Sequence, residues 1–235
     1  MSFSEDRGDV CPKRRGFLIT IDGPAGAGKS TTARALASRL GYAYLDTGAL
    51  YRAVAWVVQR AGIDCADVEA MEALLSSMDF HVSLDKGVTR TFIDNEEITG
   101  QLRSPEISRL ASTVAALPYV RDRLLPIQAR LSREGGIVAE GRDTGTRVFP
   151  EADVKFFLEA DLATRTIRRH RETVRDGYPE TQPDIRRAIE ERDANDRSRA
   201  TAPLKPAGDA VVIDSSSLTV EQVVERMLAW IPGHS

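Results

Sequence analysis

The sequence predicts an α/β fold in three layers, with a parallel sheet between two layers of helices. Short apolar runs alternate along the chain with segments of helical periodicity, which is the pattern of parallel strands joined by crossover helices. A glycine-rich turn links the first run to the first helical segment, and one stretch in the middle has a period of two instead. The 235 residues are enough for one core with a smaller lobe or insertion.

Four apolar runs are the predicted strands of the sheet, because an unbroken apolar run is typical of a strand covered on both faces. The first helix is expected to end at Gly41, a residue that suits a helix C-terminus. The last helix is expected to begin at Thr219, which has capping-box spacing to Gln222. In chain order the predicted strands are residues 17–21, 137–139, 154–158 and 210–213.

Residues 80–99 depart from this pattern. Apolar and polar residues alternate there around an Asp-Lys-Gly turn, so we expect a small antiparallel sheet inserted into the main fold. Ser104 and Pro105 then carry the signals of a helix start. The helical stretch over residues 118–133 contains Pro126, which is expected to start or kink a helix rather than continue one.

Composition excludes several classes of function. A net charge of −3 argues against a dedicated nucleic-acid binder. Cys11 and Cys65 are the only cysteines and form no C-x-x-C pair, so neither a disulfide framework nor a structural zinc site is expected. No apolar run has the length of a membrane span. Residues 1–16 lack the apolar stretch of a signal peptide, so we expect a flexible tail on a cytoplasmic protein.

The most specific motif is G-x-x-x-x-G-K-[ST], which the chain matches directly after the first predicted strand. Glycines let successive backbone N–H groups point inward around a phosphate, and the helix that follows adds its positive end. Lys29 would reach the β- and γ-phosphates, and the Ser30 hydroxyl would ligate Mg²⁺. The motif predicts a P-loop NTPase fold with a nucleoside-triphosphate site formed by Gly23, Pro24, Ala25, Gly26, Ala27, Gly28, Lys29, Ser30 and Thr31.

Two further segments place polar side chains after predicted structural elements. A polar turn precedes the helix that carries Arg52, and the turn and the arginine would suit a second anionic ligand. The alternative is an ordinary helix cap with a surface arginine. Arg142 and Asp143 follow the strand at 137–139, where open α/β sheets bind ligands. Their alternative is a local ion pair.

The segment 165–199 is rich in arginine. Interspersed acidic residues favour a solvated helix face with ion pairs for most of these arginines. A Gly-Tyr-Pro break at 177–179 divides the segment into two helices, which are typical of a mobile lid that closes over phosphates. Arg192, Asp196 and Arg199 are spaced by four and three residues, so one helix face would present them together as a clamp.

Taken in order, these motifs resemble those of bacterial cytidylate kinases. The resemblance covers about residues 17–227 and rests on IDGPAGAGKS, LDTGALYR, EGRDTGTRVFP, ERDANDRSR and APLKPA. It implies one kinase domain over residues 17–235, with a P-loop core, a mobile helical lid at about 162–195 and a nucleoside-monophosphate region at about 47–125. The β-rich stretch at 80–99 matches the insert of that region.

The resemblance also implies roles for individual side chains. Thr47 stands where serine is more familiar, and it keeps the hydroxyl group. The cytosine amino group is a donor that Asp143 can accept, whereas uracil presents an oxygen there. The implied substrate contacts are Thr47 and Arg52 at the monophosphate, Ser112, Arg121 and Asp143 at the cytosine edge, and Arg142, Arg192, Asp196 and Arg199 at the sugar and phosphates.

The implied reaction transfers the γ-phosphoryl group of Mg²⁺-bound ATP to CMP or dCMP. Its catalytic residues would be Lys29, Arg142, Arg192 and Arg199, in a protein expected to be a monomer without nucleic-acid or membrane partners. One rival is another P-loop kinase, acting on a different monophosphate, shikimate or dephospho-coenzyme A. The other is a GTP-dependent switch, which would carry an N-K-x-D motif, and no Asn-Lys pair occurs in the chain.

Overall fold

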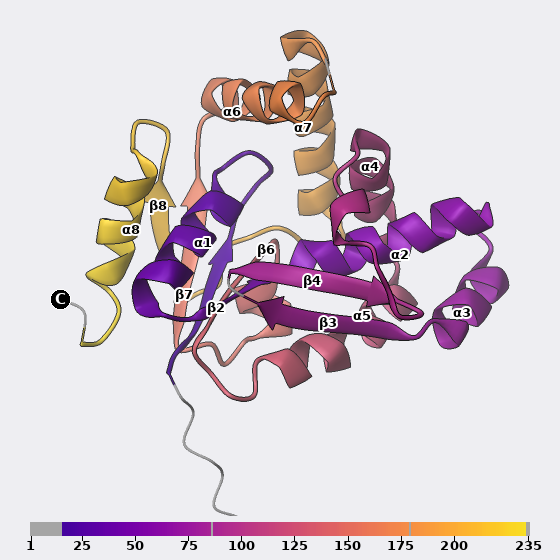
Figure 1. Cartoon of the computed structure of the whole chain (residues 1–235). Coiled ribbons are helices and arrows are strands. Elements are labelled where there is room, and N and C mark those ends of the chain that lie inside the picture. The colour runs from indigo at the N-terminus through magenta and orange to yellow at the C-terminus, as the bar shows by residue number, and fades with distance from the viewer. Residues whose placement is uncertain (1–15, 86, 179, 234–235) are drawn as a thin grey trace, which may run out of the picture.

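The computed structural model describes residues 16–85, 87–178 and 180–233, and its centre is a five-stranded parallel sheet (Figure 1). The α/β class and all four predicted strands are confirmed. The fifth strand, β2, has only four residues and runs directly into a helix, so it leaves no separate apolar run in the sequence. The sheet order is β2 (Ala43–Asp46), β6 (Ile137–Gly141), β1 (Leu18–Asp22), β7 (Val154–Glu159) and β8 (Val211–Asp214). The expected tail at 1–16 lies outside the described residues except for Gly16.

The sheet separates two apolar cores, which confirms the three layers. In β6, Ile137 and Ala139 belong to one core and Val138 to the other, as the alternation of side chains along a strand requires. Helices α1 (Lys29–Leu40) and α8 (Val220–Leu228) cover one face. The other face is covered by α2 (Thr47–Ala61), together with α5 (Pro118–Leu131). The Gly41 end of α1 and the capping box at the start of α8 are both present as predicted.

The inserted antiparallel sheet is also confirmed. Its three strands pair in the order in which they occur along the chain, and in Figure 1 they lie in front of α5. Ser104 caps the helix that follows, with its side chain accepting a hydrogen bond from the backbone N–H of Ile107. The elements of this region are α3 (Val68–Ser77), β3 (Phe80–Asp85), β4 (Val88–Ile93), β5 (Glu96–Glu97), the 3-10 turn η1 (Thr99–Gln101) and α4 (Pro105–Val114).

The expectation for Pro126 is wrong in one respect, because α5 continues through it. Pro118 occupies the first turn of α5, where a proline is well tolerated. Pro126 removes the hydrogen bond to the carbonyl of Asp122, one turn earlier. Asp122 and Pro126 both have exposed side chains, so they lie on the solvent side of α5. Water can therefore donate a hydrogen bond to the Asp122 carbonyl in place of the missing N–H.

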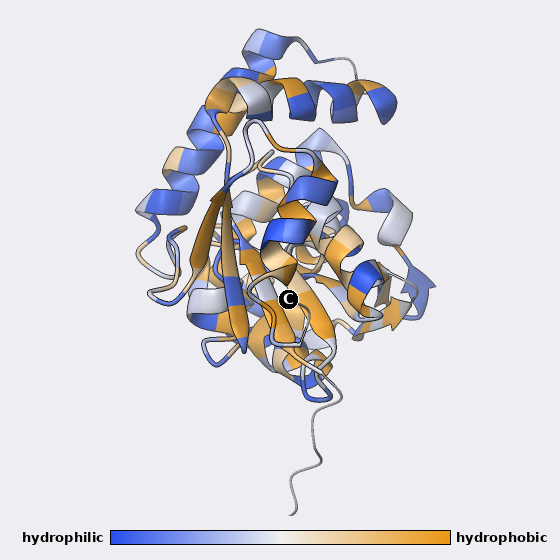
Figure 2. Ribbon diagram, turned by 90° about the vertical axis from the view of Figure 1, so that its left-hand side faces the viewer, coloured by the Kyte–Doolittle hydropathy of each residue, from blue (hydrophilic) through white to orange (hydrophobic). Residues whose placement is uncertain are grey.

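Two helices, α6 (Leu162–Arg175) and α7 (Gln182–Ser198), form the segment predicted as a lid. They lie at the top of the view in Figure 1, and Figure 2 shows that they are mostly hydrophilic, whereas the strands of the central sheet are hydrophobic. Gly177 supplies the left-handed backbone after α6, with φ +83°, while Pro179 of the predicted break is outside the described residues. None of the helices in the described ranges combines the length and apolar character that a membrane crossing needs.

Candidate active site

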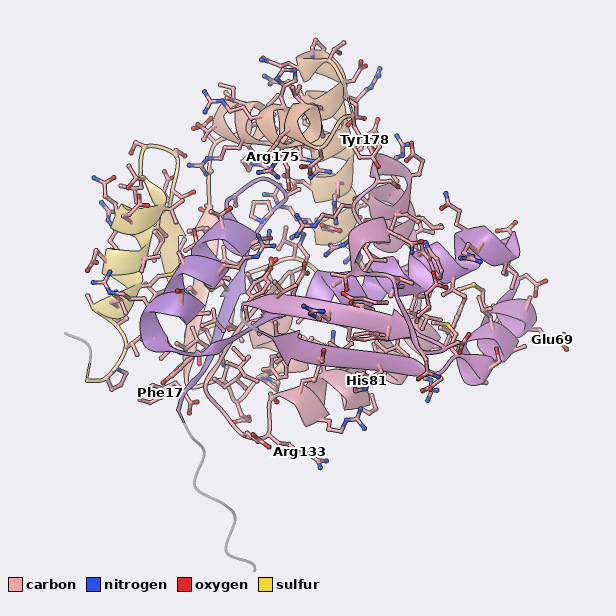
Figure 3. All side chains as sticks on the ribbon, viewed as in Figure 1. Phe17, Glu69, His81, Arg133, Arg175 and Tyr178 are labelled. Atoms are coloured by element: carbon pink, nitrogen blue, oxygen red, sulfur yellow. The ribbon has the colours of Figure 1, made fainter. Side chains whose placement is uncertain are left out.

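The glycine-rich turn connects β1 to α1 and forms one wall of a cleft of about 640 Å³. Gly28 caps α1 with φ +92°, a left-handed conformation that costs glycine little. A side chain at Gly23 would put its Cβ 2.1 Å from the carbonyl oxygen of Leu158, so the loop packs tightly on β7. Figure 3 shows Arg175 and Tyr178 at and just beyond the end of α6, and both border the cleft opposite this loop.

Lys29, the lysine of the motif, is buried at the start of α1. Its Nζ donates a hydrogen bond to the carbonyl oxygen of Pro24 at 2.7 Å, so the side chain curls back over the loop. Burial, reinforced by the positive charge of Arg142, lowers the pKa of Lys29 to about 7. A phosphate in the loop would reverse this shift, because a nearby negative charge favours the protonated amine.

A carboxylate from the neighbouring strand holds the next residue of the motif. Glu140, on β6, accepts hydrogen bonds from the Ser30 hydroxyl at 2.5 Å and from the Tyr44 hydroxyl at 3.0 Å. Burial and the adjacent carboxylate raise the pKa of Tyr44, which therefore stays a neutral donor. No role was predicted for Glu140. The signal in the sequence was that Glu140 directly follows the predicted strand at 137–139. Its place beside the glycine-rich loop depends on the pairing of Ile21 with Glu140, which the sequence does not reveal.

A second carboxylate without an assigned role, Asp22, ends β1 directly before the loop. It accepts hydrogen bonds from the backbone N–H groups of Thr144 at 2.9 Å and Gly145 at 2.7 Å, in the π-helical turn η2 (Thr144–Val148). Burial raises the pKa of Asp22 to about 6, although these hydrogen bonds oppose the shift. Oxygen ligands of this kind, on Ser30, Glu140 and Asp22, fit a hard divalent cation such as Mg²⁺.

The segment that begins α2 contains both a helix cap and a partly buried arginine. Asp46 caps α2 by accepting from the Ala49 N–H, and it forms an ion pair with Arg52 at 2.6 Å. Thr47 donates its hydroxyl hydrogen to the carbonyl of Glu140 at 2.7 Å, which directs the hydroxyl toward β6. The cap of the simpler interpretation is present, but Arg52 is not a surface residue: its side chain is 21% exposed and lines the cleft.

Asp196 is the centre of the predicted arginine clamp and is 1% exposed. It accepts from Arg142 at 2.9 Å and from Arg199 at 2.5 Å, and Arg192 lies 3.9 Å away. Burial raises the pKa of Asp196, but the three guanidinium groups outweigh burial and hold it below its usual range. Arg142 therefore pairs with a residue 54 positions away, and the alternative of a local ion pair with Asp143 is wrong.

The predicted cytosine-contacting residues are divided between two neighbouring groups. Asp143 forms a buried ion pair with Arg121, whose guanidinium also donates to the carbonyl of Ala115. Burial raises the pKa of Asp143 although Arg121 opposes the shift. Ser112 instead accepts from Arg199 at 3.1 Å, on the side of the Asp196 clamp. The fold thus gathers most of the predicted substrate-side residues into two polar clusters, while Arg52 pairs with Asp46 and Thr47 bonds to Glu140 outside them.

Arg52 and one arginine of each cluster have a side-chain donor without a partner in the described part of the chain. The Nε atoms of Arg52, Arg121 and Arg192 are buried and have no hydrogen-bond partner among the described residues. Burial, together with the positive charge of the neighbouring Arg142, lowers the pKa of Arg192 to about 9. Buried donors without partners are costly in a finished fold, so an anionic ligand is the natural partner for them.

The arginines of α6 and α7 serve two purposes. Exposed pairs such as Arg187 with Asp184 are the solvated ion pairs expected of most of the segment. Arg165 is different: it is buried, pairs with Asp193 of α7 at 2.5 Å and donates to the carbonyl of Ala25 in the glycine-rich loop at 3.2 Å. This link between the loop and both helices was not predicted, because only the fold brings the three segments together.

Comparison with known proteins gives a consistent result. The family model described as "Cytidylate kinase" matches residues 19–232. A cytidylate kinase of Pelotomaculum thermopropionicum is 46% identical over 91% of this chain and 95% of its own length. Those of Geobacter sulfurreducens and Pasteurella multocida are 44% and 42% identical, over 91% and 93% of this chain and 92% and 96% of their own lengths. With this agreement over nearly its whole length, the chain belongs to the cytidylate kinase family.

Proposed function

We propose that the protein transfers the γ-phosphoryl group of ATP to the 5′-phosphate of CMP or dCMP, giving ADP and CDP or dCDP. The observation that carries the proposal is the set of buried Nε donors on Arg52, Arg121 and Arg192 that have no partner among the described residues. Arg52 and Arg192 line the cleft beside the glycine-rich loop. A single triphosphate needs only the loop and its lysine, whereas a second group of buried cations calls for a second anion.

On the donor side of the cleft, which we define as residues 22–31 with Glu140, the loop N–H groups and Lys29 would bind the triphosphate of ATP. Ser30 and the two carboxylates, Asp22 and Glu140, would hold Mg²⁺, directly or through water. Bound there, Mg²⁺ would neutralise charge on the β- and γ-phosphates. Lys29 has to leave the carbonyl of Pro24 to reach these phosphates, which requires only a change of side-chain rotamer.

On the acceptor side, which we define as Arg52, Arg121, Asp143, Asp196 and the arginines around Asp196, the protein would bind CMP. Arg52 would hold the monophosphate through the N–H groups that Asp46 leaves free. Asp143 would accept a hydrogen bond from the amino group of cytosine with the oxygen that Arg121 does not use, while Arg121 opposes the rise in the Asp143 pKa that burial causes. UMP presents an oxygen at that position and would be repelled by the carboxylate.

The reaction requires the two substrates to be aligned and needs no general base. The attacking phosphate oxygen of CMP is already anionic at neutral pH, so no proton has to be removed before the attack. Arg142, Arg192 and Arg199 would stabilise the charge on the phosphoryl group during transfer, and Lys29 would do so from the donor side. Asp196 orients these arginines while leaving other guanidinium donors available.

We further propose that α6 and α7 act as the mobile lid at about 162–195 of a monomeric, cytoplasmic enzyme without nucleic-acid partners. Arg165 supports the lid assignment, because it joins both helices to the loop that would hold the triphosphate. Closing the lid would exclude water from the phosphates and prevent wasteful hydrolysis of ATP.

The test is an ADP-release assay in which the purified protein and Mg²⁺-bound ATP are given different acceptors. We expect turnover with CMP and dCMP, much slower turnover with UMP, and background rates with AMP and shikimate. Fast turnover with AMP or shikimate and none with CMP would refute the proposal. Titrating CMP and dCMP side by side would show which sugar the enzyme prefers.

A further inference from the structure

The inserted sheet touches the main sheet at its outer edge. Strand β2 ends the sheet order, so one side of its backbone has no neighbouring strand within the central sheet. Strand β4 of the insert approaches this side through Thr89, which is 5% exposed. Thr89 also lines a small cavity of about 230 Å³ together with Arg52 and Arg103, two basic residues that border the main cleft as well.

The hydroxyl group of Thr89 makes two hydrogen bonds to the edge of β2. It donates to the carbonyl of Tyr44 at 3.0 Å and accepts from the N–H of Asp46 at 2.8 Å. In a parallel sheet, one residue of the next strand pairs with two alternate positions of its neighbour in the same way. A single side chain therefore replaces a strand residue, and it satisfies a buried donor and a buried acceptor at once.

This contact fixes the backbone of Asp46, which in turn positions Arg52 on the acceptor side. Asp46 caps α2 with one carboxylate oxygen and pairs with Arg52 through the other. A displacement of the Asp46 backbone would shift both the start of α2 and the guanidinium of Arg52. The glycine-rich loop has no hydrogen bond to Thr89 in the described part of the chain. Its link to β2 runs through Glu140, which accepts from both the Tyr44 and the Ser30 hydroxyls, so a displacement reaches the loop through one residue more than it reaches Arg52.

We propose that Thr89 is a positioning residue for the acceptor phosphate, an inference that rests on the proposed function. By fastening the insert to β2 at Asp46, the Thr89 hydroxyl holds Asp46 and Arg52 in the geometry that binds the phosphate of CMP. It touches neither substrate itself. The insert thereby helps to position the acceptor side. Its contact with the main sheet affects the affinity for CMP and not the affinity for ATP.

The decisive variant is Thr89→Val, which keeps the shape of the side chain and removes both hydrogen bonds. We expect the KM for CMP to rise about fivefold, the effect of roughly one net hydrogen bond, while the KM for ATP stays within about twofold. Thr89→Ser keeps the hydroxyl and should restore the wild-type KM for CMP. Thr89→Ala removes the hydroxyl without putting a methyl group in its place beside the polar edge of β2. It should also raise the KM for CMP and leave the KM for ATP unchanged.

Strand β4 offers a matched control in Thr91. This residue is fully buried two positions further along, and its hydroxyl has no partner within the described residues. Thr91→Val makes the same chemical change on the same strand, so both KM values should stay at the wild-type level. An equal rise in the KM for CMP in Thr91→Val and Thr89→Val would overturn the proposal, because general disturbance of the insert would then explain it.

Three results separate this inference from the proposed function. A wild-type protein that releases no ADP with CMP refutes the proposed function before any variant is compared. A wild-type protein that uses CMP, with Thr89→Val and Thr89→Ala shifting neither KM or both equally, refutes only the role of Thr89. Faster hydrogen exchange at the Asp46 amide in Thr89→Val, together with a raised KM for CMP alone, supports the positioning role.

Discussion

The two sides of the cleft are built in opposite ways. The donor side comes mainly from one continuous stretch of sequence, and its polar groups already have partners in the protein: Lys29 with Pro24, and Ser30 with Glu140. The acceptor side is assembled from distant segments, and its buried Nε donors on Arg52 and Arg192 find no partner among the residues that the structure describes. The donor side is thus preformed by its own backbone, whereas the acceptor side depends on the whole fold and on its ligand.

The largest expected effect is on the donor side, where Lys29 is the only basic side chain within residues 22–31. Lys29→Met removes the only lysine of the loop while keeping the length of the side chain. We expect kcat to fall about 10³-fold, equivalent to about 4 kcal/mol of lost transition-state stabilisation. Steady-state ADP release at saturating CMP measures this loss.

Arg39→Ala serves as the control for Lys29→Met, because Arg39 lies on the same helix with an exposed side chain. Its kcat should equal that of the wild-type protein. If kcat fell less than tenfold in Lys29→Met, the backbone N–H groups would stabilise the transferred phosphoryl group without the lysine.

The second prediction concerns the stability of the acceptor side. Asp196→Asn removes a buried carboxylate, which within the described residues is the acidic ion-pair partner shared by three partly buried arginines, Arg142, Arg192 and Arg199. Since this leaves three partly buried positive charges uncompensated, we expect the free energy of unfolding to fall by about 3 kcal/mol. Urea unfolding of the ligand-free protein at an unchanged m-value measures it.

Glu190→Gln is the matched control on the same helix, because Glu190 pairs with Arg186 at the surface. The exposed pair should contribute no more than about 0.5 kcal/mol. Equal losses in the two variants would contradict the picture of the acceptor side as a cluster of partly buried positive charge compensated by Asp196.

The same contrast explains what could be predicted from the sequence. The glycine-rich loop and the insert were predictable because local spacing alone determines them, as a motif or as a period of two. The roles of Asp22 and Glu140 were not, because they depend on the register of β1 and β6, strands more than 100 residues apart. Pro126 was misjudged because a local rule cannot tell that its helix face is exposed.

The third prediction tests base recognition on the acceptor side. Asp143→Ala removes the proposed partner of the cytosine amino group, together with the charge that Arg121 neutralises. We expect kcat/KM for CMP to fall about a hundredfold, with a much smaller loss for UMP, because only cytosine gains from an acceptor at that position. Competition assays with both nucleotides measure the ratio. A CMP-to-UMP preference that stays at the wild-type value would refute the role of Asp143.

The smallest predicted effect is a pH dependence of ATP binding on the donor side. Burial holds the pKa of Lys29 near 7 in the free protein, whereas the bound triphosphate favours the protonated amine. As the pH rises above 7, free Lys29 loses its proton, and binding then has to recover it. Affinity should therefore fall about fivefold from pH 7 to pH 8, with uptake of nearly one proton per ATP at pH 8. Calorimetry in buffers of different ionisation enthalpy measures the uptake. Lys29→Met should bind ATP more weakly and without proton uptake. If the wild-type protein took up no proton on binding ATP at pH 8, the Lys29 amine would not contact the phosphates.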